Sequence, residues 1–429
     1  MNVSDSERVA TSLASQGYTI TADADSADVV LINTCSVREK AEQKLYTRIG
    51  RLRKDDGKMP VVGVLGCVAQ LEGETLFKKN RNIDFVIGTK AVGRVADAIQ
   101  KLFDSGERTA DLAERDIDYD WSVSEGQRHS PYVSFVPIIE GCNKFCTYCI
   151  VPFSRGREHS FASGQIIEQV RHLNRTGVKE VHLIGQNVNS YRPQDDDLLD
   201  TIKGTTPFSK LLRGVAHTGI ERIKFTTSFP RDFRSDIVDA INESENICNW
   251  VHLPVQSGSD RVLKAMRRGH TIDSYLKKID YIKSSPRDIS LTTDIIVGFP
   301  GETEKDFLET VKMVEYCDFD SAYIFKYSPR PGTPAYEMDD DVSAAEKTRR
   351  FIELERVQKE SQYRSLQRYL GRTLSVLAEK RSARSENDLS GHSTCHKVVN
   401  FKASPDRLGS IVNVRITEVK SNSFYGEVC

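Results

Sequence analysis

The sequence predicts an α/β protein with three parts: a small parallel α/β domain, a central (β/α)6 part-barrel and a small all-β barrel. Helix and strand patterns alternate over roughly the first hundred residues. Six more strand patterns alternate with helix patterns up to residue 326, and the end of the chain holds only short strand patterns between turns. We therefore expect domains at 1–104, 130–370 and 371–429, with an acidic linker at 105–129.

Composition limits the class of protein. The chain has 429 residues, of which 38% are hydrophobic and 28% charged, with a net charge of −1, which is typical of a soluble globular protein of several domains. The N-terminus has no basic region followed by an apolar segment, and no later apolar run is long enough to span a bilayer. We expect a cytoplasmic protein without a membrane partner. Nine cysteines in such a chain indicate metal or redox chemistry rather than a disulfide framework.

The first domain is expected to begin with a helix at 4–15, started by a capping box of Ser4 and Glu7. The strand patterns cover 28–32, 61–65 and 84–87, and the following helix patterns end near 53, 78 and 103. Cys35 and Cys67 follow the first two strands. Parallel sheets bind ligands at the carboxyl ends of their strands, so the two thiols can converge there. The alternative interpretation is that Cys35 and Cys67 are only two buried thiols near a sheet edge.

The expected linker is the most acidic stretch of the chain. Residues 104–120 hold seven acids against Arg108 and Arg115, with little apolar content, which predicts a solvated connection.

The central region shows a regular series of strands and helices. Strand patterns cover 132–139, 180–184, 222–227, 250–254, 290–297 and 321–326, and helix patterns cover 163–175, 207–217, 260–267, 272–284 and 304–317, with another after Pro230. Barrels of this kind carry their catalytic and ligand-binding residues on the loops after the strands. Polar clusters follow the later strands, at 185–189, 228–231, 256–259 and 298–302. Each alone is an ordinary turn, but together they predict a rim of backbone and amide groups suited to a polar cofactor.

Cys142, Cys146 and Cys149 lie directly after the first strand of this series. Three cysteines within eight residues suit an iron–sulfur cluster in which one iron has no protein ligand. The alternatives are small hydrophobic residues on one helix face, or half of a zinc site. Gly141 and Asn143 favour a loop over a helix, and no second cysteine or histidine pair completes a zinc site. The remaining partnerless cysteines are expected to be packing residues or inert thiols: Cys248, Cys317, Cys395 and Cys429.

A long charged helix is expected at 343–370, before the C-terminal module. Strand patterns there cover 373–379, 397–401, 411–419 and 424–428, between glycine and polar turns. Residues 371–429 contain nine Lys and Arg against six acids. Small β-barrels with basic and aromatic surfaces often bind RNA, although a merely solvated basic surface explains the count as well.

These motifs resemble the methylthiotransferases of the radical S-adenosylmethionine superfamily over essentially the whole chain. Residues 141–156 are similar to that family's cluster loop and 294–302 to its late-strand cofactor motif, and the terminal barrel resembles a TRAM domain, an RNA-binding module. Residues 31–43, 185–191 and 252–259 are similar to the MiaB branch, which modifies tRNA.

The resemblance implies a reaction. Cys142, Cys146 and Cys149 would hold a [4Fe–4S] cluster that cleaves S-adenosylmethionine to methionine and a 5′-deoxyadenosyl radical. The radical would abstract hydrogen from carbon 2 of N(6)-isopentenyladenosine beside the tRNA anticodon. Cys35, Cys67 and a third cysteine would hold an auxiliary cluster that supplies sulfur, and Gln186, Gln256 and Gly298 are the cofactor-rim candidates. The implied partners are a tRNA bound through the TRAM domain and the barrel rim, an electron donor and a sulfur donor, with the enzyme a monomer.

Two departures from the family leave alternatives open. The third auxiliary cysteine of the family lies in a Cys-Gln-Met-Asn motif, and this chain starts at Met1 and Asn2 of that motif. Either the true start lies upstream, or the auxiliary cluster is incomplete and the protein binds RNA and S-adenosylmethionine without inserting sulfur. Phe161 and Ala162 stand where the family usually has Arg-Pro, which puts a rim contact in doubt. A ribosomal-protein aspartate methylthiotransferase is a further alternative, which the stretches after strands two and four oppose.

Overall fold

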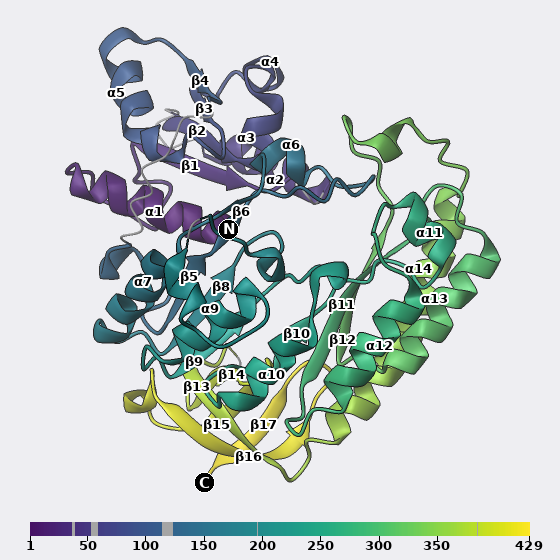
Figure 1. The fold of residues 1–429 in the computed structure, drawn as a ribbon. Coiled ribbons are helices and arrows are strands. Elements are labelled where there is room, and N and C mark those ends of the chain that lie inside the picture. Colours follow the sequence, from purple (N-terminus) through teal and green to yellow (C-terminus); the bar gives the residue numbers. More distant parts are fainter. Residues whose placement is uncertain (37–38, 53–58, 114–122, 195, 384) are drawn as a thin grey trace. The chain divides into compact units, whose positions relative to one another are not determined.

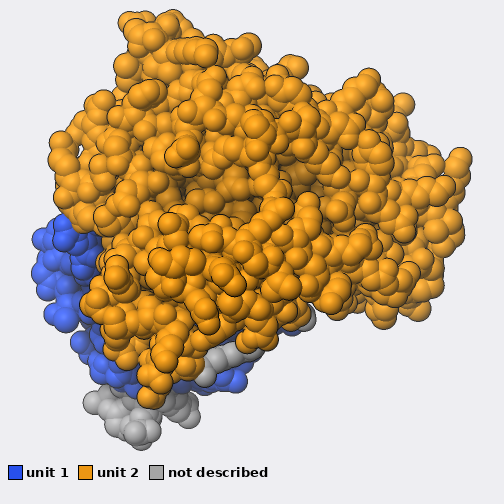
Figure 2. All heavy atoms as spheres, turned by 90° about the horizontal axis from the view of Figure 1, so that it is seen from below, with its two compact units in different colours: residues 1–129, 140–145, 149–158 blue, residues 130–139, 146–148, 159–429 orange. Residues whose placement is uncertain are grey.

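A computed structural model describes residues 1–36, 39–52, 59–113, 123–194, 196–383 and 385–429. The chain forms two compact units, shown as a ribbon in Figure 1 and as coloured spheres in Figure 2. Unit 1 comprises residues 1–129, 140–145 and 149–158, and unit 2 comprises residues 130–139, 146–148 and 159–429. The division passes through the cysteine-rich loop. Within the described ranges, no helix has the length and apolar character needed to cross a membrane.

Unit 1 contains a parallel four-stranded sheet in the order β1-β2-β3-β4. Its strands are β1 (Val29–Thr34), β2 (Val61–Gly66), β3 (Phe85–Ile87) and β4 (Thr109–Asp111). The helices of this unit are α1 (Asn2–Ser15), α2 (Glu39–Gly50), α3 (Cys67–Glu72), α4 (Thr75–Lys79), α5 (Val95–Ser105) and α6 (Val151–Arg155). Val9 and Ile99, from α1 and α5, share one apolar core with Phe85. Leu45 and Val68, from α2 and α3, share another with alternate β1 and β2 residues. Opposite strand faces carry different cores, so both faces of the sheet are covered.

Three expectations for this region need correction. The capping box is wrong: α1 begins at Asn2 without a side-chain cap, because the Glu7 carboxylate accepts a tertiary hydrogen bond from the His129 N–H at 2.7 Å. The helix expected to end near 78 is two short helices, α3 and α4. The expected linker contains a strand, since β4 pairs with β3 and Arg94 holds Asp111 at 2.5 Å. Residues 37–38 of the 31–43 stretch and 114–122 of the expected linker lie outside the described residues.

Unit 2 contains six parallel strands in two sheets, β5-β8-β9 and β10-β11-β12, among the described residues. The N–H of Ser228, just after β9, donates to the carbonyl of His252 in β10 at 3.2 Å, so the two sheets follow one another as an open part-barrel. The strands are β5 (Val133–Pro137), β8 (Glu180–Ile184), β9 (Arg222–Phe225), β10 (Trp250–His252), β11 (Ser290–Val297) and β12 (Ser321–Lys326). The expected strand at 132–139 is interrupted after Pro137, and the short strands β6 (Ile139–Glu140) and β7 (His159–Ser160) follow.

Helices alternate with these strands as the sequence predicts. They are α7 (Ser163–Arg175), α8 (Asp197–Asp200), α9 (Pro207–Ala216), α10 (Ser235–Glu243), α11 (Asp260–Ala265), α12 (Ile272–Lys283), α13 (Glu304–Cys317) and α14 (Ala344–Gln367). The long helix α14 packs along β12 and α13 (Figure 1). Its C-terminal Leu366, followed by Tyr369, enters the core of the terminal barrel.

The C-terminal module is a closed barrel in the order β13-β14-β15-β17-β16. Its strands are β13 (Thr373–Arg381), β14 (Asp388–Ser393), β15 (Val398–Lys402), β16 (Ile411–Val419) and β17 (Phe424–Val428). The sequence pattern missed β14, whose Asp, Gly and Ser content has low strand propensity. Gly391 is required there, because a Cβ would lie 1.7 Å from the carbonyl oxygen of Leu377 on β13. The three-part α/β architecture confirms the predicted fold class.

Polar side chains join this barrel to the β/α strands of unit 2. Arg222 on β9 donates to the His392 carbonyl and to the Ser375 hydroxyl, both at 2.9 Å. Lys397 pairs with Asp320 at 3.0 Å. These side chains are largely buried, so the module is part of the same packed unit.

Candidate functional site

Cys35 and Cys67 lie at adjacent strand ends in unit 1, as predicted. Thr34 and Gly66 are the last paired residues of β1 and β2, and each is followed by one of the cysteines. Cys67 is buried and starts α3, whereas Cys35 is partly exposed. Gly66 has φ +88°, and a Cβ at this position would lie 2.3 Å from the Asn33 amide oxygen, so the close approach of the two strand ends depends on glycine.

A buried cation lies near this strand edge. The Arg155 guanidinium contacts the carboxylates of Asp5 and Glu140 at 2.6 and 3.0 Å, and all three side chains are at most 3% exposed. Burial alone would lower the pKa of Arg155, but Asp5, Cys67 and Glu140 together hold it above its usual value. The guanidinium is therefore a permanent positive charge carried by α6, which packs against α3, the helix that begins with Cys67. The neighbouring Ser154 carbonyl accepts from Thr89 at 2.7 Å, which fixes α6 to the sheet domain.

Cys142 and Cys149 belong to the loop residues of unit 1. The Cys142 N–H donates to the Gly156 carbonyl at 3.1 Å, and Cys142 is buried. Gly141 has φ +76°, and a Cβ would lie 2.0 Å from the Arg157 carbonyl oxygen, so only glycine fits before this cysteine. Phe145 also has a positive φ, of 48°, and its ring is half exposed.

Cys146 lies in the loop segment that belongs to unit 2, next to the buried Thr147. The Thr147 N–H and hydroxyl donate to the carbonyls of Met266 and Ala265 at 3.1 and 2.9 Å, and its carbonyl accepts from the Ala335 N–H at 2.8 Å. Three bonds from two distant segments therefore fix the backbone between Cys146 and Cys149. No local pattern indicated this role of Thr147, because its partners lie more than a hundred residues away in the sequence.

Arg268 is a second residue that the sequence reasoning missed. Its Nη1 lies 3.4 Å from the Cys146 sulfur, its Nη2 donates to the Pro254 carbonyl at 2.7 Å, and the guanidinium lies over the Phe229 ring at 4.4 Å. A fixed cation beside a thiolate stabilises negative charge on sulfur. A local sequence feature that could have indicated this residue is the arginine pair Arg267 and Arg268, shortly after α11.

The rim candidates occupy loops after β8, β10 and β11. Among the residues that the structure describes, the buried side-chain oxygen of Gln186 has no hydrogen-bond partner, and neither has the buried hydroxyl of Ser228 after β9. Gln256 is buried and adopts φ +79°, while its backbone bonds to Asp294 and Ile296 at 2.9 Å each. Gln256 is thus held beside β11, and Gly298, the residue directly after this strand, has φ +71°. The structure brings Gln256 and the end of β11 together, and leaves two polar rim oxygens available to a ligand.

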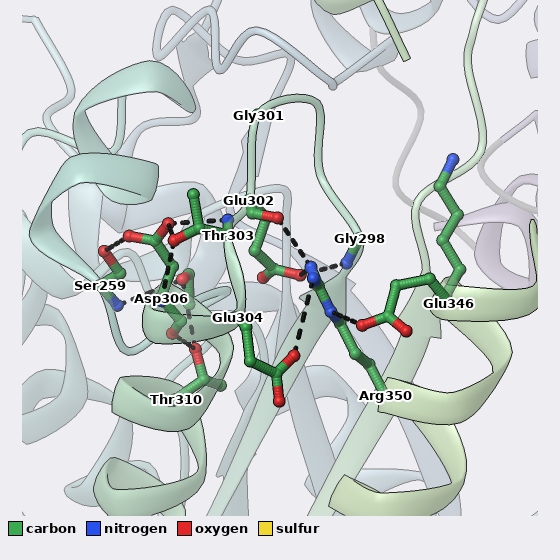
Figure 3. Close-up of polar contacts among 12 residues, drawn as sticks. Ser259, Gly298, Gly301, Glu302, Thr303, Glu304, Asp306, Thr310, Glu346 and Arg350 are labelled. Carbon is green, nitrogen blue, oxygen red and sulfur yellow. Dashed lines mark hydrogen bonds and ion pairs between the residues drawn. The ribbon is translucent and has the colours of Figure 1, made fainter. Parts of the chain in front are cut away.

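The loop after β10 is fastened to α13. The Ser259 hydroxyl donates to Asp306 at 2.6 Å (Figure 3). The Gly258 N–H donates to the Thr310 hydroxyl at 2.9 Å. Burial would raise the pKa of Asp306, but hydrogen bonds from Arg261, Ser259 and Thr303 outweigh it and hold the pKa well below its usual value. A cavity of about 710 Å³ lies beside this contact, lined in part by Gly258 and Ser259 of the predicted rim, but not by Gln186, Gln256, Gly298 or any of the candidate cysteines.

The remaining cysteines differ from these. Cys248, Cys317 and Cys395 are buried, and burial raises the pKa of Cys248 and of Cys317 to about 12, which suits inert packing thiols. Cys429 is exposed. Phe161 and Ala162 replace the Arg-Pro pair noted in the sequence analysis. Phe161 is buried, and its ring lies edge-on to the His159 ring, with 5.0 Å between the ring centroids.

No group of three or more His, Cys, Asp or Glu side chains is arranged around a single metal-ion position in the part of the chain that the structure describes. An iron–sulfur cluster does not require such a group, because each cysteine binds a different iron of the cluster.

Comparison with protein families gives three matches along the chain. Residues 1–88 match "Uncharacterized protein family UPF0004", residues 136–314 match the "Radical SAM superfamily" and residues 367–429 match the "TRAM domain".

Full-length relatives are also known. A protein of Sulfurihydrogenibium sp. (strain YO3AOP1), named tRNA-2-methylthio-N(6)-dimethylallyladenosine synthase, is 41% identical over 100% of this chain and 97% of its own length. A protein of the same name from Cronobacter sakazakii (strain ATCC BAA-894) is 42% identical over 100% of this chain and 90% of its own.

Among solved structures, the radical S-adenosylmethionine methyltransferase TsrM from Kitasatospora setae has a similar fold. The structure with cobalamin and a [4Fe–4S] cluster bound superposes with a TM-score of 0.52 at 15% identity, over 77% of this chain and 73% of that one. The structure with tryptophan and a S-adenosylmethionine analogue gives a TM-score of 0.53 at 13% identity, over 78% and 72%. At this identity the likeness concerns the fold alone.

Proposed function

Because the chain belongs to the family of tRNA-2-methylthio-N(6)-dimethylallyladenosine synthases, radical S-adenosylmethionine methylthiotransferases, we propose that it replaces the hydrogen on carbon 2 of N(6)-isopentenyladenosine, next to the tRNA anticodon, with a methylthio group. The observation that carries the proposal is the loop of Cys142, Cys146 and Cys149 after the first strand of the part-barrel.

The residues of this loop fit a [4Fe–4S] cluster. Gly141 lets Cys142 follow a left-handed turn, Thr147 fixes the backbone between the other two cysteines, and Arg268 places a cation 3.4 Å from the Cys146 sulfur. A positive charge favours the anionic sulfurs that such a cluster requires. We assign Cys142, Cys146 and Cys149 as its ligands.

The rim residues fit S-adenosylmethionine, a zwitterionic cofactor with many polar atoms. Among the described residues, the buried side-chain oxygens of Gln186 and Ser228 have no hydrogen-bond partner, which is costly unless a ligand binds them. Gln256 and Gly298 adopt a left-handed backbone at the strand ends. A [4Fe–4S] cluster held by Cys142, Cys146 and Cys149 would supply the electron needed to cleave S-adenosylmethionine to methionine and a 5′-deoxyadenosyl radical. Gln186, Gln256 and Gly298 orient the cofactor in this proposal.

Cys35 and Cys67 are the proposed ligands of an auxiliary cluster that would supply the sulfur atom, and a second S-adenosylmethionine would supply its methyl group. Their support is the pairing of Thr34 with Gly66 and the nearby cation of Arg155. Both cysteines lie in residues 1–104, which we propose as the sulfur-donating domain, with 130–370 as the cofactor-cleaving domain and 371–429 as the RNA-binding module.

The partners follow from this scheme. The C-terminal barrel and the rim would bind tRNA, an electron donor would reduce the cluster and a sulfur donor would renew the auxiliary cluster. We propose a cytoplasmic monomer, since tRNA is available there and the scheme needs one copy of each domain.

The test is a nucleoside analysis in cells that lack this modification. We expect cells that carry the chain to contain 2-methylthio-N(6)-isopentenyladenosine in tRNA, detected by mass spectrometry, and cells with Cys146→Ala to contain only the isopentenyl nucleoside. Absence of the methylthio product with the unaltered chain would refute the proposal.

Iron counting tests the auxiliary site separately. After anaerobic reconstitution, two clusters give about eight irons per chain and the triad alone gives about four. Cys67→Ala should lower a value near eight by about four. A value near four in the unaltered chain would remove Cys35 and Cys67 from the mechanism.

A further inference from the structure

The turn after β11 is closed by a buried carboxylate. The Gly298 N–H donates to the Glu302 carboxylate at 2.6 Å, and the Glu302 N–H donates to the Phe299 carbonyl at 2.9 Å. Glu302 is 3% exposed, and burial raises its pKa while Gly298 and Arg350 oppose the rise. A buried carboxylate needs a cation to stay charged, and its position then depends on that cation.

Arg350 of α14 supplies this cation. Its Nη1 donates to both the backbone oxygen and the carboxylate of Glu302, each at 2.8 Å, and its Nε donates to Glu346 at 2.8 Å (Figure 3). The Arg350 side chain is 5% exposed. One guanidinium therefore holds the backbone and the side chain of the residue that closes the turn.

The same helix constrains Gly298 from a second direction. A Cβ at Gly298 would lie 2.3 Å from Cγ of Lys347, one helical turn before Arg350. The Lys347 ammonium is itself held by the Asp340 carboxylate at 2.6 Å. Gly298 thus lies directly against α14, so a change in the helix contact changes the turn.

We propose that Arg350 is a positioning residue for S-adenosylmethionine, which acts through Glu302 by holding the Gly298 turn in its binding conformation. This inference rests on the proposed function, in which Gly298 is part of the cofactor rim. A purely structural role is the competing explanation, in which the ion pair only fastens α14 to the β/α strands. The two explanations differ in whether cofactor affinity changes while the fold is intact.

Neighbouring arginines on α14 provide a matched test. Arg349 has the same charge and makes several carboxylate contacts, but its side chain is 44% exposed and it does not bond Glu302 in any contact of the described residues. The variants Arg350→Gln, Arg350→Lys and Arg349→Gln are prepared as full-length, anaerobically reconstituted proteins. The dissociation constant of S-adenosylmethionine is measured by equilibrium dialysis, and hydrogen exchange at the Gly298 amide is measured by mass spectrometry.

We expect Arg350→Gln to raise the dissociation constant about tenfold, the usual scale for losing a supporting contact behind a binding group. It should also speed exchange at the Gly298 amide. The dissociation constant of Arg350→Lys should lie between those of the unaltered protein and of Arg350→Gln, because an ammonium cannot replace both guanidinium contacts at once. Arg349→Gln should stay within about twofold of the unaltered protein, since its contacts are exposed.

An unchanged dissociation constant in Arg350→Gln, or an equal rise in Arg349→Gln, would overturn the proposal. Should Arg350→Gln fail to fold, Glu302→Gln tests the same contact without leaving an unpaired carboxylate, and unchanged affinity in that variant would overturn it as well. If the unaltered protein cleaves no S-adenosylmethionine yet binds it, and Arg350→Gln weakens that binding, the proposed function fails while the role of Arg350 stands.

Discussion

Arg155 offers a sharp test of how unit 1 holds its part of the cysteine loop. Asp5 and Glu140 are each at most 3% exposed and contact the same guanidinium at 2.6 and 3.0 Å. Arg155→Ala leaves both carboxylates buried without that cation, and breaking a buried ion pair costs about 3–5 kcal/mol. We expect a loss of this size in the free energy of unfolding of unit 1.

Hydrogen exchange at the amides of residues 62–65 measures this free energy, because β2 is an interior strand of the unit 1 sheet. Lys101→Ala is the control in the same unit: Lys101 contacts Glu107 at 3.0 Å, but both side chains are about half exposed, and such a pair contributes about 1 kcal/mol or less. Replacing the charges together, by Arg155→Met with Asp5→Leu and Glu140→Leu, should recover most of the loss. A cost below about 1 kcal/mol for Arg155→Ala would refute this reasoning.

Three further predictions concern unit 2. Gly298→Ala should cost more in thermal stability than Gly332→Ala, since both have positive φ but only Gly298 also meets Lys347 at 2.3 Å; equal melting temperatures would contradict this. Burial is the main cause that lowers the pKa of His396 to about 2 in the folded protein, from 6.5 in the unfolded chain. Below pH 6.5 only the unfolded chain binds this proton, so we expect the free energy of unfolding to fall by about 1 kcal/mol between pH 6.5 and 5.5. His396→Gln should flatten that slope, and an unaltered slope would argue against the assignment. Thr147→Val should lower stability by about 1 kcal/mol through the lost buried hydroxyl bond while Thr147→Ser retains it, and cluster content measured by iron analysis should follow the same order.

Much of the fold was predictable because the signals are local. The periodic apolar strands at 180–184 and 290–297 correspond to β8 and β11, within the part-barrel that the alternating pattern predicts. Strands that depend on neighbours were missed. β4 and β14 are short or rich in polar residues and glycine, and they form because an adjacent strand needs a partner.

The positions of two candidate cysteines at adjacent strand ends were also predictable from local patterns. Strand ends placed Cys35 beside Cys67, because parallel pairing makes the ends of β1 and β2 adjacent. Arg268 and Arg350 could not be found, since their partners Cys146 and Glu302 lie 122 and 48 residues away in sequence. Which arginine becomes buried against a distant group depends on tertiary packing, and no local pattern encodes it. The predicted capping box failed for the same reason.

Cofactor cleavage by the reconstituted chain tests the central claim most directly. Under anaerobic conditions with a strong reductant, the account predicts that the full chain converts S-adenosylmethionine to 5′-deoxyadenosine and methionine, measured by chromatography and mass spectrometry. Cys146→Ala should release none, whereas Cys248→Ala, which changes a buried cysteine outside the triad, should retain the reaction. Release of 5′-deoxyadenosine by Cys146→Ala at the rate of the unaltered chain would contradict the account.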